Sequence, residues 1–145
     1  MYQNIVVGTD CSATADRAVL KAAAVAKMTG ARLHVVCAYR EPIPAMAAAE
    51  APTVFVGNVT AEAIHAQTVH VEALAERLRA DGVDVEARVE TGGAAATLVG
   101  VADVVDADLL VVGDRGLKGV RGLLGSVPSR VTHRACIDVL VVHTT

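Results

Sequence analysis

A glycine-rich, basic segment at residues 113–126 has the residue types and spacing that best suit the binding of an anion. It reads GDRGLKGVRGLLGS, with five glycines three residues apart and cations at positions 115, 118 and 121. Glycine lacks a Cβ atom, so backbone N–H groups can approach an anion closely. Ser126 stands where a helix should begin, and the free N–H groups of a helix N-terminus favour phosphate. The segment therefore predicts a phosphate-binding loop, with a plain flexible connection as the alternative.

The charge distribution favours a small anionic ligand over a nucleic-acid polymer. Residues 113–136 carry a formal net charge of +4, whereas the rest of the chain carries −7 and the whole chain −3. The phosphate motif GxxxxGK[ST] is absent, and no GxGxxG follows the first predicted strand, which argues against P-loop hydrolysis and dinucleotide hydride transfer. With only three aromatic residues, the chain also lacks the stacking surfaces that hold single-stranded nucleic acid. No nucleic-acid partner is expected.

The composition is that of one compact domain. The chain has 145 residues, of which 53% are hydrophobic and 20% charged, and this balance suits a single core. No apolar run is long enough to span a bilayer, and no secretory signal precedes the first strand, so we expect a cytoplasmic protein with no membrane partner. The three cysteines lie far apart without CxxC spacing. They predict buried free thiols and no metal site built from protein side chains alone.

Strands and helices alternate along the whole chain. Short β-rich apolar runs are followed by segments with helical spacing, and residues 83–90 alternate apolar and charged residues as a half-exposed edge strand does. We expect strands at 5–7, 33–38, 83–90, 109–112 and 139–142, helices at 13–28, 60–79, around 98–105 and at 126–135, and a long loop at 40–59. Right-handed crossovers between parallel strands then predict one α/β domain over residues 1–145. It is a three-layer fold, an open five-stranded parallel sheet with helices on both faces.

Ligands of such sheets bind at the carboxyl ends of the strands, where the strand order reverses. The residues expected there are 9–10, 38–39, 92–93 and 113–114. Asp10 is a candidate ligand contact or the N-cap of the following helix, and Ser12 is the more natural cap. Ser126 is predicted to cap the last helix and to bind phosphate. It is not a hydrolase nucleophile, because GxSxG is absent.

Cys11 and two histidines carry weaker signals. Cys11 lies beside the ligand end and is a redox sensor if a helix N-terminus lowers its pKa, with an inert thiol as the favoured alternative. His65 and His70 are five residues apart and therefore lie on different faces of a helix. We expect them to be surface residues rather than a metal-binding pair.

Four segments of the chain resemble the universal stress protein family, in particular its nucleotide-binding members of the actinobacterial type. They are IVVGTDCS at residues 5–12, VVG ending at Gly113, LLGSVPSRV at residues 123–131 and DVLVV at residues 138–142, and the likeness extends over the entire chain. The resemblance implies an adenine-nucleotide alpha-hydrolase-like fold with strand order 3-2-1-4-5. It also implies a homodimer formed through the last strand, whose apolar residues are Val139, Leu140, Val141 and Val142.

The resemblance implies that ten residues bind a nucleotide. Asp10 would contact the ribose hydroxyls, Thr9 and Ala38 would line the adenine site, and Val112 would offer backbone groups to the base. The residues implied to hold the phosphates are Gly113, Gly116, Gly125 and Ser126, with Arg115 and Val127 completing the site.

The chain departs from the family pattern at two places. Eight residues separate Gly116 from Gly125, one fewer than in the family's G-x2-G-x9-G-[S/T], and the shorter loop suits one cyclic phosphate better than three. Cys11 stands where the family has glycine. A positive φ there would strain the cysteine by on the order of 1 kcal/mol.

These features predict a binding protein that senses or buffers an adenine nucleotide in a stress response. ATP, with Mg²⁺ on its phosphates, is the first ligand expected, and cyclic AMP is the alternative. Slow ATP hydrolysis or autophosphorylation is the enzymatic alternative, for which no base or arginine finger can be identified. A nucleotide-free dimeric interaction protein is the third possibility, and no catalytic residue is predicted.

Overall fold

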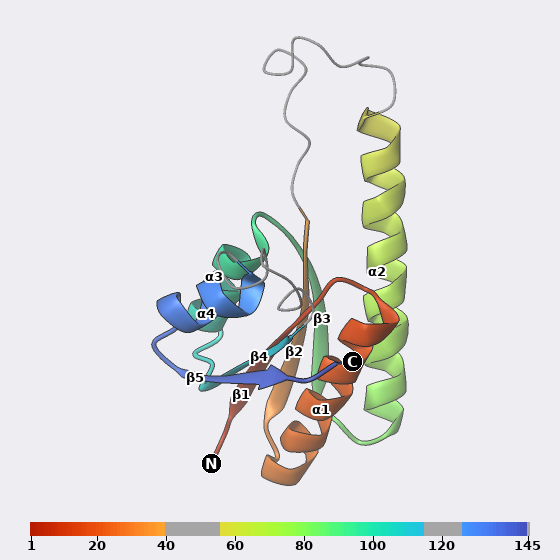
Figure 1. The fold of residues 1–145 in the computed structure, drawn as a ribbon. Helices are drawn as coiled ribbons and strands as arrows, with labels where there is room; N and C mark the ends of the chain where they lie inside the picture. Colours follow the sequence, from red (N-terminus) through yellow and green to blue (C-terminus); the bar gives the residue numbers. More distant parts are fainter. Residues whose placement is uncertain (40–55, 115–125, 145) are drawn as a thin grey trace.

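The computed structural model describes residues 1–39, 56–114 and 126–144, and it shows a five-stranded sheet with helices on both faces (Figure 1). The strands lie in the order β3-β2-β1-β4-β5 and all neighbours are parallel. The predicted fold and strand order are confirmed. The strands are β1 (Asn4–Thr9), β2 (Arg32–Tyr39), β3 (Val85–Thr91), β4 (Leu109–Gly113) and β5 (Asp138–Val142), and the helices are α1 (Ala13–Thr29), α2 (Val56–Ala80), α3 (Ala94–Val104) and α4 (Val127–Arg134).

Two hydrophobic cores, one on each face of the sheet, hold the layers together. Successive side chains of a strand point to opposite faces, so Ile5 and Val7 of β1 pack against α1 and α2, whereas Val6 packs against α3 and α4. All three are fully buried. Helices cover both faces, and for this reason the central strands are continuous apolar runs. None of the helices within the described ranges combines the length and apolar character needed to cross a membrane.

The boundaries of two elements differ from those that the sequence predicts. α2 begins at Val56, inside the expected loop at 40–59, because a helix can extend through Gly57 at a cost of only about 1 kcal/mol. The rest of that expected loop, residues 40–55, lies outside the described residues. β3 runs from Val85 to Thr91 and so begins two residues later than expected, because its register with β2 pairs Leu33 with Val85. The alternation of apolar and charged residues in the sequence does not show which residue of β2 lies opposite Val85.

The three cysteines lie in different environments. Cys37 is buried in β2 and Cys11 is half-buried, but Cys136 is exposed. The expectation that all three thiols are buried is therefore wrong for Cys136, which lies in the bend between α4 and β5.

Candidate functional site

A cavity opens at the carboxyl ends of β1 and β4, the two neighbouring strands between which the strand order reverses. Its volume is about 140 Å³, on the order of the cavity that takes up a benzene ring. Six of the ten residues predicted to bind a nucleotide line it: Thr9, Asp10, Ala38, Val112, Gly113 and Val127. The other lining residues are Gly8, Ala15, Val36, Ala94, Leu98 and Thr144. The described part of the chain thus forms a compartment large enough for one small ring.

The cavity is apolar inside, with polar groups along part of its wall. Val36, Leu98 and Val112 are buried hydrophobic residues, and they offer surface for a planar base. Thr9, Asp10 and Thr144 supply the polar side chains. Few polar groups in an apolar hollow are typical of a small-molecule site, because apolar burial supplies affinity and the polar groups fix orientation.

Close packing at Gly113 explains why β4 ends in glycine. A Cβ atom at this position would lie only 2.9 Å from Thr144 Cγ2. Glycine therefore allows the chain after β5 to lie against the end of β4, where Thr144 reaches the cavity. Gly92 and Gly93, also expected at the ligand end, precede α3, and from this connection Ala94 lines the cavity.

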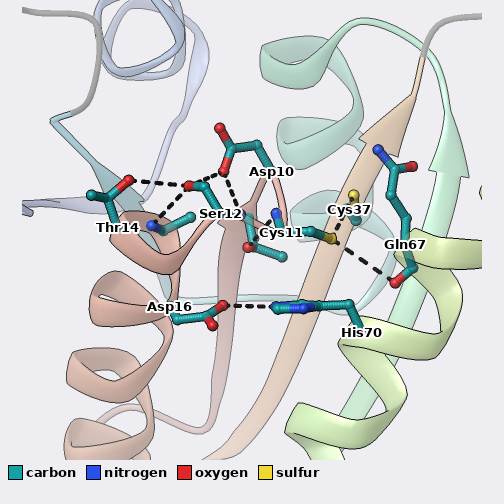
Figure 2. A network of polar contacts seen from close by, with 10 residues as sticks. Asp10, Cys11, Ser12, Thr14, Asp16, Cys37, Gln67 and His70 are labelled. Carbon is teal, nitrogen blue, oxygen red and sulfur yellow. Dashed lines mark hydrogen bonds and ion pairs between the residues drawn. The ribbon is translucent and has the colours of Figure 1, made fainter. Parts of the chain in front are cut away.

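The sequence left two roles open for Asp10, a ligand contact or the N-cap of α1. Ser12 is the N-cap of α1, because its hydroxyl accepts a hydrogen bond from the Ala15 N–H at 3.2 Å. Asp10 Oδ1 in turn accepts from the Ser12 N–H at 3.0 Å and from the Ser12 hydroxyl at 2.5 Å (Figure 2). Asp10 is therefore not the cap of α1. It is an exposed carboxylate at the cavity whose Oδ1 is oriented by Ser12.

Cys11 adopts the strained backbone conformation that its replacement of glycine predicts. Its φ is +63°, which lies in the left-handed region that residues other than glycine adopt at a cost of about 1–2 kcal/mol. Its N–H donates to Thr9 Oγ1 at 3.0 Å, which stabilises the turn. Burial, Cys37 and the negative Asp10 and Asp16 raise the pKa of Cys11 to about 12. The hypothesis of a lowered pKa at Cys11 is therefore wrong.

The start of α4 lies where the glycine-rich segment ends. Ser126 caps this helix, since its hydroxyl accepts from the Ser129 N–H at 3.3 Å, as predicted. Val127 is 37% exposed and lines the cavity, but Ser126 does not. Arg115, Gly116 and Gly125 lie outside the described residues. Their assignment as phosphate contacts stays a prediction.

Sequence reasoning missed Thr144, which lines the cavity, and the contacts that join it to Asp114, a residue expected at the ligand end. Asp114 Oδ1 accepts from the Thr144 N–H at 2.9 Å and from its hydroxyl at 2.8 Å, and Asp114 Oδ2 lies 2.5 Å from His143 Nδ1. These contacts hold the buried Thr144 at the cavity. The pairing of the last two strands could have revealed the contact between Asp114 and Thr144. β4 and β5 are parallel with Gly113 opposite Val142, so residues directly after both strands must meet.

A second missed contact joins α1 to α2. His65 is exposed as expected. His70, however, is half-buried, and its Nε2 lies 3.0 Å from Asp16 Oδ1. His70 is thus a partly exposed residue that also pairs with Asp16, because α2 packs alongside α1 and brings Asp16 opposite it (Figure 2).

Low pH should weaken the contacts that the Asp114 carboxylate makes with Thr144 and His143. Hydrogen bonds from the Thr144 N–H and hydroxyl, with His143 adding to them, lower the Asp114 pKa from 3.8 to about 2. A carboxyl whose pKa is lower in the folded state stabilises the fold above its unfolded pKa and loses that contribution as pH falls through the folded value. We expect thermal unfolding between pH 4 and pH 2 to show a smaller pH dependence for Asp114→Asn than for the wild-type chain. Equal slopes for the two proteins would contradict this coupling.

Comparisons with known proteins by family, by sequence and by structure all find universal stress proteins. Residues 1–143 match the universal stress protein family. The universal stress protein Rv1636 of Mycobacterium tuberculosis is 41% identical over 145 residues, covering 99% of this chain and 98% of that protein. A crystal structure of a universal stress protein in complex with cAMP is 38% identical with a TM-score of 0.75, covering 99% and 98% of the two chains. The universal stress protein of Archaeoglobus fulgidus in complex with dAMP, 24% identical with a TM-score of 0.70 and 97% coverage of both chains, shares the fold.

Proposed function

This chain belongs to the universal stress protein family, and from that membership we propose that it binds an adenine nucleotide in the cavity at the carboxyl ends of β1 and β4. The observation that carries the proposal is that six residues assigned to a nucleotide by sequence line one cavity. The universal stress protein solved with cAMP, at 38% identity over nearly the whole chain, supports the same ligand class.

In this proposal the base occupies the apolar part of the cavity. Val36, Leu98 and Val112 contact the ring faces, and Ala38 leaves the room that the ring needs. The ribose lies at Asp10, whose carboxylate accepts a hydrogen bond from a ribose hydroxyl. A charged acceptor strengthens such a bond. The phosphate extends past Gly113 towards the N-terminal end of α4, where Ser126 and the glycine-rich segment complete the site.

Cyclic AMP is the ligand that the findings favour over ATP. The relative solved with cAMP is one reason. The eight-residue spacing between Gly116 and Gly125 is another, because a shorter loop encloses one phosphate more readily than three. If ATP binds instead, Mg²⁺ would be held mainly by its phosphates, because Asp10 is the one carboxylate among the described residues that line the cavity.

The proposed role is that of a binding protein that responds to nucleotide during stress, not that of an enzyme. Asp10 is the sole ionisable side chain among the described residues that line the cavity. Acid–base catalysis and phosphoryl transfer need a positioned base and cations at the reacting phosphate. One exposed carboxylate suits ligand binding better than turnover. A cytoplasmic location stays a prediction.

Titration calorimetry with cyclic AMP, AMP, ATP with and without Mg²⁺, and GTP tests the ligand class. We expect cyclic AMP to bind more tightly than ATP and GTP to give no heat, since the base is held by a close apolar cavity. A Tm increase should accompany binding, because a ligand at 100 times its Kd stabilises the fold by about 2.7 kcal/mol. Tighter ATP binding would overturn the preference for cyclic AMP. The absence of binding by every adenine nucleotide would overturn the proposal.

The edge strand β5 supports a proposed homodimer. Leu140 and Val141 are each 38% exposed on this strand, and an apolar edge favours pairing with another copy. We expect Val141→Lys to convert a dimer to a monomer, measured by light scattering after size-exclusion chromatography. Val104→Lys, at a 78% exposed valine of α3, is the control and should stay dimeric. A wild-type chain that is monomeric at every concentration would contradict the homodimer.

A further inference from the structure

Two thiols that are 26 residues apart in the sequence lie together beside the cavity. The Sγ atoms of Cys11 and Cys37 are separated by 3.6 Å (Figure 2). The S–S bond of a disulfide is about 2.05 Å long, so a short movement of the side chains would bring the two sulfurs to bonding distance. Both cysteines are free.

The sheet and the turn after β1 together bring the thiols close. Thr9 and Cys37 are opposite each other in the parallel pairing of β1 with β2. Cys37 belongs to the core on the side of α1 and α2, and Cys11 packs against that core. The left-handed conformation of Cys11, fixed by its bond to Thr9, turns the chain at this point. Such strain at a non-glycine residue persists only where the surroundings hold it.

α2 covers the pair and limits its freedom. The Gln67 carbonyl oxygen lies 3.9 Å from Cys11 Sγ, and the Asp16–His70 contact connects α1 with α2 close by (Figure 2). Cys37 is fully buried, whereas Cys11 is half-buried. A small oxidant can therefore reach Cys11 first, and Cys37 is the nearby thiol that can resolve the product.

We propose that Cys11 and Cys37 form a redox site that hydrogen peroxide or a small organic peroxide converts to an intramolecular disulfide. This inference stands on the geometry of the pair and does not depend on nucleotide binding. Cys11 loses its proton and attacks one peroxide oxygen, the O–O bond breaks, and water (or an alcohol) leaves after protonation. Cys37 then attacks the Cys11 sulfenic acid, the S–O bond breaks, and a water leaves. Two thiols are oxidised by two electrons and one peroxide is reduced by two.

The environment makes this reaction slow and its product persistent. Burial raises the pKa of both thiols, so little thiolate is present at neutral pH to attack the peroxide. Because the thiolate is disfavoured, the reduced state gains nothing from ionisation, and a disulfide, once formed, is not readily reduced. The pair therefore responds to sustained oxidation rather than to a brief pulse.

The disulfide should also stabilise the fold. It closes a loop between positions 11 and 37 and removes conformations from the unfolded chain. For a domain of this size we expect a Tm increase on the order of 5 °C or more over the reduced protein. The same bond would fix the turn that carries Asp10 relative to the end of β2.

The test uses the full chain with Cys136→Ser, which removes the exposed thiol and with it disulfides between copies. After prolonged treatment with hydrogen peroxide, we expect both remaining thiols to be lost, with a mass decrease of two hydrogen atoms that dithiothreitol reverses. Peptide mapping should join the peptide that holds Cys11 to the one that holds Cys37. The Tm should rise on oxidation and fall again on reduction.

Two further variants keep the proposal falsifiable. Cys11→Ser and Cys37→Ala, each combined with Cys136→Ser, cannot form the bond and should show neither the mass decrease nor the Tm increase. If one of them fails to fold, the other is sufficient. Addition of oxygen atoms without loss of hydrogen in the Cys136→Ser protein would overturn the proposal. So would retention of both thiols after peroxide has fully oxidised Cys136 in the wild-type chain.

Discussion

Replacing Ala38 by leucine is expected to weaken the binding of cyclic AMP on the order of 100-fold while the fold is kept. Ala38 is the half-buried residue at which β2 lines the cavity. A larger side chain there would fill space proposed for the base, and overpacking of a close-fitting site costs about 1–3 kcal/mol. Each 1.4 kcal/mol corresponds to a tenfold change in Kd. Calorimetric titration of the purified variant measures the effect directly.

Two control variants separate a blocked cavity from a damaged fold. Ala38→Ser keeps the small volume and should bind within a few-fold of the wild-type chain. Ala66→Leu makes the same change of side chain at an exposed position of α2 and should leave the affinity unchanged. Thermal unfolding should give similar Tm values for all of these proteins without ligand. Normal affinity of Ala38→Leu would show that the base lies elsewhere.

Removing the Asp10 carboxylate is expected to weaken every ligand that carries a ribose. A hydrogen bond to a charged group contributes about 1.5–3 kcal/mol, so Asp10→Ala should raise the Kd of cyclic AMP and of AMP by about 10-fold to 150-fold. Adenine alone should bind the variant and the wild-type chain equally, because it has no ribose. Calorimetry with the three ligands gives this comparison.

The contact between Asp10 and Ser12 requires its own control. Asp10→Asn keeps an oxygen that can accept from the Ser12 N–H, so the turn is kept while the charge is lost, and we expect an intermediate affinity. Ser12→Ala removes the N-cap of α1 and should lower stability by about 1 kcal/mol, with a smaller effect on the Kd than Asp10→Ala. If Asp10→Ala binds as tightly as the wild-type chain, Asp10 only orients Ser12.

Local patterns in the sequence determined most of the fold. The apolar runs at Ile5–Val7 and Leu109–Val112 predicted strands of a parallel sheet covered on both faces, because helices on both faces require apolar residues on both. The alternation before Gly92 predicted an edge strand, and β3 lies at an edge. Ser12 and Ser126 marked the starts of helices through capping that involves only neighbouring residues. The same strand ends indicated where the cavity lies.

Other features depended on distances between remote segments, which no local pattern contains. The sequence left Asp10 as ligand or cap, and only the Ser12 contacts decided against the cap. Asp114 and Thr144 meet because the ends of β4 and β5 are level in the sheet. Cys11 and Cys37 meet through the register of β1 with β2. Periodicity and capping come from interactions within a few residues, whereas side-chain neighbours across the sheet follow from strand register and helix packing, and these only the tertiary structure decided.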